Sequence, residues 1–153
     1  MKTLAEIFYD AILADDDLMT TTGGRVVSTC FEIPPGNEDN TPLPNIIITN
    51  DGFTNNNSTK DVVWESDEDV VAATVNVAAG SPQEVDAIVA MVRKAIETYV
   101  CSMCASGQDT PELQDGFPQS NGIAWDWVKP CYYQEIVYSC VTKKFQGNEQ
   151  EDN

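Results

Sequence analysis

Residues 68 to 100 are typical of a β-strand that turns into a long amphipathic helix, and this unit constrains the fold more than any other segment. Gly80 ends the strand, Ser81 suits a helix N-cap, Pro82 fits the first helical position, and Glu84 completes a capping box. The strand alternates apolar with smaller or polar side chains, as expected when one face meets a core. Its core-facing members are Val71, Ala73, Val75, Val77 and Ala79.

The helix after Pro82 carries one continuous apolar stripe. The stripe has the spacing of three, four and seven residues that a buried helix face shows. Its members are Val85, Ile88, Val89, Val92, Ala95, Ile96 and Tyr99. Because Arg93 and Lys94 fall on the other side, we expect one buried and one solvated face, with the helix running to Cys104 or Ala105 and ending near Gly107.

A first helix is predicted from Thr3 to about Ala14, where Thr3 and Glu6 form another capping box. Its expected buried face comprises Leu4, Ile7, Phe8, Ala11 and Ile12. Leu18-Met19 suggests one more short helical turn, and Gly23-Gly24 ends this part of the chain.

Strands are predicted over several further segments rich in β-branched or aromatic residues. These are Arg25 to Ile33, Asn45 to Thr49, Val62 to Glu65, Ile123 to Val128 and Tyr132 to Thr142. The last two could pair as a hairpin across Lys129-Pro130. Asn50-Asp51-Gly52 is a turn signal, and we expect a mobile loop or hairpin tip over 53–60 and a loop over 106–121.

These elements predict a single α+β domain over residues 1–145. The sheet is expected to be mainly antiparallel, with the N-terminal helix and the long central helix packed on one face. Residues 146–153 are polar and are expected to form a disordered acidic tail.

The formal net charge of −17, from 25 acidic and 8 basic residues, is the most unusual bulk property. Such a field disfavours binding to phosphate backbones and anionic membranes. The charge could serve solubility, contact basic partner surfaces, or line a channel through which DNA slides. No apolar run approaches the ~20 residues of a membrane span. The first six residues do not resemble a signal peptide, so we expect a cytoplasmic protein.

Catalytic motifs are missing from the sequence. It contains no histidine, the commonest general base, and Thr22 to Arg25 lacks the spacing of a phosphate-binding loop. The 25 acids supply many accidental carboxylate pairs, so a histidine-free carboxylate enzyme stays only as a weak alternative. We interpret the acidic run Glu65 to Asp69 as a solvated turn, not a metal site. No enzymatic activity, cofactor or metal is therefore expected.

Five cysteines at irregular spacing favour reduced thiols over a disulfide framework. They are Cys30, Cys101, Cys104, Cys131 and Cys140. The pair Cys101 and Cys104 lies near a predicted helix end, where neither a zinc site nor a thioredoxin-type motif is expected. We interpret this pair as small apolar side chains one helical turn apart, following the general tendency of cysteine to be buried.

Aromatic residues gather in the predicted strands. Trp125 and Trp127 are two positions apart and so should share one strand face. They could cap the core against the helices, which aromatic burial favours, or form an exposed stripe at a subunit interface. The interface candidates are Trp64, Asp67, Glu68, Asp69, Trp125 and Trp127.

Three features occur in a familiar order over roughly residues 3 to 100. They are an N-terminal helix followed by Gly24-Arg25-Val26, a proline-bearing loop from Thr41 to Pro44 directly before an apolar strand, and the strand-turn-helix through Ser81. In this order the chain resembles the small tail-completion proteins of long-tailed bacteriophages and prophages, which include tail terminators and head-to-tail joining proteins. It departs from their plain pattern in the Asn-rich segment 50–60 and the loop 106–121.

The resemblance implies a structural role. Members of that family form rings, often hexameric, at the tail end or between tail and portal neck, where they stop tube growth and dock the head. The implied partners are further copies of the chain and tail-tube and neck proteins. The implied location is the host cytoplasm during assembly and then the virion tail or neck. A small acidic binding or adaptor module, resembling a DNA mimic, is the alternative function.

Overall fold

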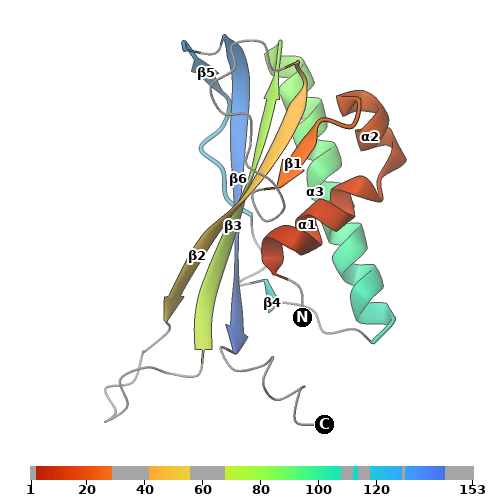
Figure 1. Cartoon of the computed structure of the whole chain (residues 1–153), viewed down its shortest axis with the longest axis vertical. Coiled ribbons are helices and arrows are strands. Elements are labelled where there is room, and N and C mark those ends of the chain that lie inside the picture. Colours follow the sequence, from red (N-terminus) through yellow and green to blue (C-terminus); the bar gives the residue numbers. More distant parts are fainter. Residues whose placement is uncertain are drawn as a thin grey trace.

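The computed structural model describes residues 3–28, 42–55, 68–107, 112–113, 118–128 and 130–143. It has an α+β fold in which a twisted sheet carries helices on one face (Figure 1). The helices are α1 (Leu4–Leu13), α2 (Asp16–Thr22) and α3 (Pro82–Ala105). The strands are β1 (Val26–Ser28), β2 (Asn45–Asn55), β3 (Glu68–Ala79), β4 (Glu112–Leu113), β5 (Ala124–Asp126) and β6 (Cys131–Lys143). The predicted fold class is confirmed.

The six strands form one sheet in the order β1-β2-β3-β6-β4, with β5 also paired to β6. All pairs are antiparallel except β1 with β2, which is parallel. The ladder between β3 and β6 is the longest, running from Glu68 opposite Lys143 to Ala79 opposite Tyr132. The two strands are far apart in sequence, so the sheet is complete only when the C-terminal hairpin lies beside β3.

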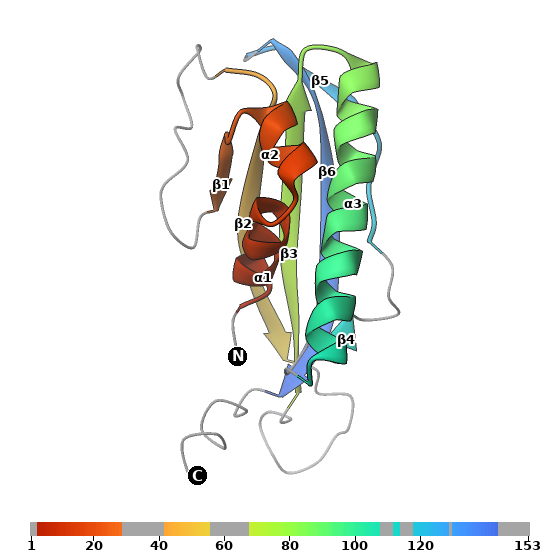
Figure 2. The same cartoon turned by 90° about the vertical axis from the view of Figure 1, so that its right-hand side faces the viewer.

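The helices cover one face of the sheet, and the core lies between the two layers (Figure 2). The predicted apolar faces of α1 and α3 are buried, Tyr99 being half-buried. On β3, Ala73, Val75, Val77 and Ala79 are fully buried, and Val71 is half-buried against the same core. Both predicted N-caps are present, because Thr3 Oγ1 accepts from Glu6 N at 3.2 Å and Ser81 Oγ accepts from Glu84 N at 3.2 Å.

The turn predicted at Asn50-Asp51-Gly52 is wrong, because β2 continues through it to Asn55. The register with β3 shifts between Asn50 and Phe53, so the extra residues form a bulge instead of ending the strand. Gly52 has φ +85°, a value that glycine adopts without strain. The Asp51 carboxylate accepts hydrogen bonds from the hydroxyls of Thr49 and Thr74, which fastens the bulge to β3. Residues 56–60 and the predicted strand Val62 to Glu65 lie outside the described residues.

The predicted C-terminal hairpin is confirmed, since β5 pairs antiparallel with the start of β6. The predicted strand 123–128 is shorter, ending at Asp126. The loop predicted over 106–121 is partly wrong, because β4 pairs with Cys140 and Val141 and Gln119 forms a bridge with Val137. The composition of this segment predicted a loop, but residues that favour turns can still form backbone hydrogen bonds with a long neighbouring strand such as β6. The predicted tail 146–153 and residues 29–33 lie outside the described residues.

Arg25 joins two segments that are distant in sequence. Its Nε donates to Pro44 O at 2.9 Å and its Nη2 donates to Leu43 O at 3.2 Å. The backbone closes the same junction, because Ile46 N donates to Arg25 O at 3.0 Å. Gly23 leaves room for this side chain, since a Cβ there would lie 2.6 Å from Arg25 Nη1. The guanidinium thus fixes the parallel start of β1 against β2.

We expect Arg25→Ala to lower the free energy of unfolding by about 2 kcal/mol, because hydrogen bonds from a charged donor contribute ~1.5–3 kcal/mol. Urea denaturation followed by circular dichroism measures the change. Arg93→Ala, at an exposed position of α3, is the matched control and should stay within about 0.5 kcal/mol. Equal stability of the Arg25 and Arg93 variants would contradict this role.

The core holds two titratable side chains on β6. The Tyr138 ring packs on Phe8 with 4.6 Å between ring centroids, and its buried hydroxyl has no hydrogen-bond partner among the described residues. Burial raises the pKa of Tyr138 to about 12, although the charge of Arg93 opposes this shift. Burial alone raises the pKa of the Cys140 thiol to about 11. Both groups are therefore held in their neutral forms.

Tyr138→Phe should raise the free energy of unfolding by about 1 kcal/mol at neutral pH, because it removes an unpaired buried hydroxyl while keeping the ring. In the wild type, the free energy of unfolding should fall as the pH rises from about 10 toward 12, because the phenol ionises more readily in the unfolded chain than in the folded protein. The variant should lose less stability over that range, as thermal melts at increasing pH would show. Tyr132→Phe, at a half-buried position of the same strand, is the control. A clear loss of stability in Tyr138→Phe would mean that the hydroxyl has a favourable partner.

Candidate functional site

Aromatic and apolar side chains, all exposed except the half-buried Tyr132, gather where β5 meets β6. We call this group the aromatic corner, and it comprises Ile123, Trp125, Trp127, Val128 and Tyr132. Trp127 is 85% exposed and Trp125 is 37% exposed. Val128 is as exposed as Trp127. Exposed apolar side chains are unremarkable singly, but a contiguous group marks an interaction surface.

The corner is organised by edge-to-face aromatic contacts. Trp125 lies directly across from Tyr132 in the β5–β6 ladder, with 4.7 Å between ring centroids and an interplanar angle of 65°. Trp127 packs on Trp125 at 5.9 Å and 81°. Such pairs add ~0.5–1.5 kcal/mol to the effect of area burial. The rings therefore hold one another in place without being covered.

The sequence predicts that the two tryptophans share one strand face, and this prediction is wrong. Trp127 lies beyond the end of β5, in a turn where Asp126 Oδ1 accepts from Val128 N at 3.0 Å. This local side-chain turn, common for aspartate, brings the Trp127 ring back toward Trp125. The high exposure of Trp127 also contradicts the interpretation that it caps the core.

Hydrogen bonds fasten the chain before the corner to β6. Gln119 and Val137 exchange backbone hydrogen bonds of 2.9 and 2.8 Å. Ser120 Oγ accepts from Gly122 N at 3.1 Å and from Gln134 Nε2 at 2.9 Å. The corner is therefore carried on a fixed edge of the sheet.

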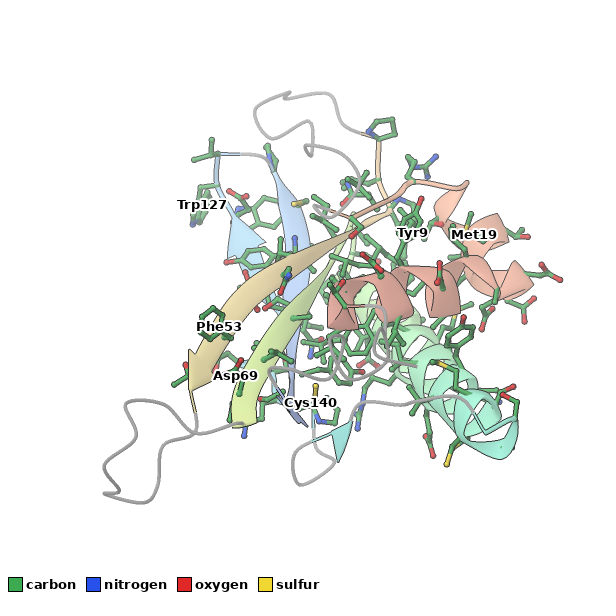
Figure 3. All side chains as sticks on the ribbon, turned by 60° about the horizontal axis from the view of Figure 1, so that its bottom comes forward. Tyr9, Met19, Phe53, Asp69, Trp127 and Cys140 are labelled. Atoms are coloured by element: carbon green, nitrogen blue, oxygen red, sulfur yellow. The ribbon has the colours of Figure 1, made fainter. Side chains whose placement is uncertain are left out.

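Of the other predicted interface residues, Asp69 does not join the aromatic corner. Trp64, Asp67 and the Glu68 side chain lie outside the description. Asp69 pairs with Thr142 at the far end of the β3–β6 ladder, whereas Trp125 pairs with Tyr132. Positions 132 and 142 of β6 are ten residue steps apart, which corresponds to about 33 Å along the strand. Figure 3 shows Asp69 and Trp127 well apart, so Asp69 does not share a site with the two described tryptophans.

A groove, which we call the helical groove, lies between α1, the start of α2, and α3, and it encloses about 400 Å³. Its apolar lining includes Ala11, Met91, Ala95 and Tyr99. Asp15, Asp17 and Lys94 supply its charges, and Asp15 also caps α2 by accepting from Leu18 N at 3.0 Å. Sequence reasoning missed the groove because its walls come from distant segments. The alanines at positions 11 and 95, which leave space between helices, are the only signal.

The four described cysteines do not form a second candidate site. Cys101 and Cys104 are free and exposed on the last turns of α3, so the expectation that they are buried is wrong. They lie on the solvated side of a helix whose stripe of buried residues ends at Ile96. Cys140 is buried and free, as predicted for a reduced thiol, Cys131 is also buried, and Cys30 lies outside the described residues.

Within the described ranges, no group of three or more cysteine, aspartate and glutamate side chains is placed to hold a metal ion. None of the described helices combines the length and hydrophobicity that a bilayer span requires.

No family model and no curated protein match the sequence. Among solved structures, the chain is similar to a chain of the "virion of native gene transfer agent (GTA) particle". The sequence identity is 14% and the TM-score is 0.48. The match covers 92% of this chain and 94% of the other.

Trp127→Ala should change the free energy of unfolding by less than about 0.5 kcal/mol, because the side chain is almost fully exposed. Trp125→Ala should cost about 1–2 kcal/mol, because it also removes the contact with Tyr132. Urea denaturation at low protein concentration separates the two variants. A larger loss for Trp127 than for Trp125 would show that Trp127 belongs to the folded core.

Proposed function

We propose that this protein is a structural tail-completion component of a phage or prophage virion. It assembles as a ring at the tail end or the head-to-tail interface, stops growth of the tail tube and joins the tail to the neck. The observation that carries the proposal is the aromatic corner, where Trp127 is 85% exposed in the turn that follows β5. Tryptophan is enriched among the residues that contribute most to protein–protein contacts.

The fold supports the resemblance that suggests this role. Two of the segments that carry it, Gly24-Arg25-Val26 and the proline-bearing loop before β2, are joined by the hydrogen bonds from Arg25 to Leu43 and Pro44. The third, the strand-turn-helix through Ser81, forms the centre of the fold. The segments thus act as one structural unit.

The charge of −17 suits a protein past which DNA must move. A negative ring lumen repels the phosphate backbone, so DNA passes without electrostatic capture. The proposal includes no catalytic activity and no cofactor. Its partners are further copies of the chain, the tail tube and neck proteins, and its locations are the host cytoplasm during assembly and then the virion.

Mixing the purified protein with tail tubes and imaging them by negative stain tests the role. We expect density at one end of each tube, and tube subunits that polymerise with the protein present should give shorter tubes. Labelling along the whole tube, or none at all, would contradict the proposal. Bovine serum albumin, another acidic protein, controls for non-specific adhesion.

The second candidate is an acidic binding module that resembles a DNA mimic, and the net charge favours it. The two functions differ in salt dependence. A DNA mimic releases its basic partner as salt rises, because screening weakens charge contacts. Tube-end binding through apolar side chains should persist at the same salt concentration.

A further inference from the structure

The molecule carries a projecting apolar group and a recess on different sides. The aromatic corner lies at the β5–β6 edge of the sheet, and Trp127 lies apart from the α1 and α2 residues Tyr9 and Met19 (Figure 3). The helical groove lies between α1, α2 and α3, on the layer that covers the sheet. Two unlike surfaces on different sides of one chain permit a head-to-tail contact between identical copies.

The groove has the size and chemistry that an indole ring requires. Its volume of about 400 Å³ lies within the ~300–1,000 Å³ of binding sites for small organic groups. Ala11, Ala95 and Met91 offer apolar surface, and methionine sulfur packs favourably on aromatic rings.

The charged groups of the groove match the polar features of tryptophan. The ammonium group of Lys94 can approach the face of an indole ring, where a cation is attracted. The carboxylates of Asp15 and Asp17 can accept from the indole Nε1–H, which is a donor only. A single indole can therefore meet Lys94 over its ring face and one carboxylate at its Nε1–H, whereas an aliphatic side chain can meet neither.

We propose that Trp127, with Val128 beside it, inserts into the helical groove of a second copy of this chain. The inference rests on the proposed function, because it specifies the contact that repeats around the ring. Like-charged copies repel one another, and an apolar insertion is an interaction that can offset this repulsion. Repulsion weakens as salt screens it, and self-association should therefore strengthen with ionic strength.

Two variants test the contact from its two sides. Trp127→Ala removes the projecting group and keeps the groove. Thr98→Trp fills the groove from an exposed position of α3 and keeps the projecting group. Sedimentation velocity should show oligomers for the wild type and monomers for each variant alone. An equimolar mixture should give heterodimers and nothing larger, because each pair has only one intact junction.

Two matched control variants test whether loss of self-association is specific to Trp127 and the helical groove. Phe53→Ala removes an exposed aromatic side chain from β2, and Glu97→Trp adds tryptophan to α3 outside the groove lining. Both should assemble like the wild type, and circular dichroism confirms that every variant is folded. Monomeric wild type at all concentrations and salt levels, unchanged assembly of either test variant, or a mixture that remains monomeric would overturn the inference.

Tail-tube labelling separates this inference from the proposed function. If Trp127→Ala and Thr98→Trp still form rings on tube ends, the contact is wrong and the function survives. If the mixture gives heterodimers while the wild type never labels tube ends, the contact is right and tail completion is wrong.

Discussion

The antiparallel ladder between β3 and β6 is the constraint on which the rest of the structure depends. Its register places Val75 opposite Ile136 and Ala73 opposite Tyr138, so both strands bury side chains on the same face. Strand side chains alternate with a period of two, and a slip by one residue would turn every buried side chain to solvent. The helices must therefore lie on that face, and the edge of β6 is left to receive β4, Gln119 and β5.

This arrangement divides the molecule into a packed layer and a surface for contacts. Arg25 closes one side of the sheet through main-chain carbonyls, and its hydrogen bonds are used within the fold. On the other side, the β5–β6 hairpin ends in rings that contact one another and remain exposed. Trp127 therefore contributes little to folding, which leaves it available for a partner. In a chain with a net charge of −17, apolar surface of this kind determines where another protein can approach.

The sequence correctly predicted the elements whose start, end or buried face is specified by neighbouring residues alone. Ser81-Pro82 and the alternation on β3 define their elements without help from the rest of the chain. It failed at Gly52, where a left-handed glycine suits a turn and a bulge equally, and only the partner strand β3 decides. For the aromatic corner, the sequence identified Trp125 and Trp127 as candidates, but their exposure depends on where β5 ends. The helical groove was unpredictable, because a recess between α1 and α3 is a property of their packing.

The central ladder also affects the order of folding. On a growing chain, β3 and α3 leave the ribosome long before β6, the strand that completes their core. Contacts between such distant segments form slowly, because a long loop must close before they contribute stability. Until then the edge of β3 that pairs with β6 stays unpaired, and unpaired strand edges make nascent chains prone to aggregate or recruit chaperones. The same ladder that stabilises the finished protein thus makes its synthesis the vulnerable stage.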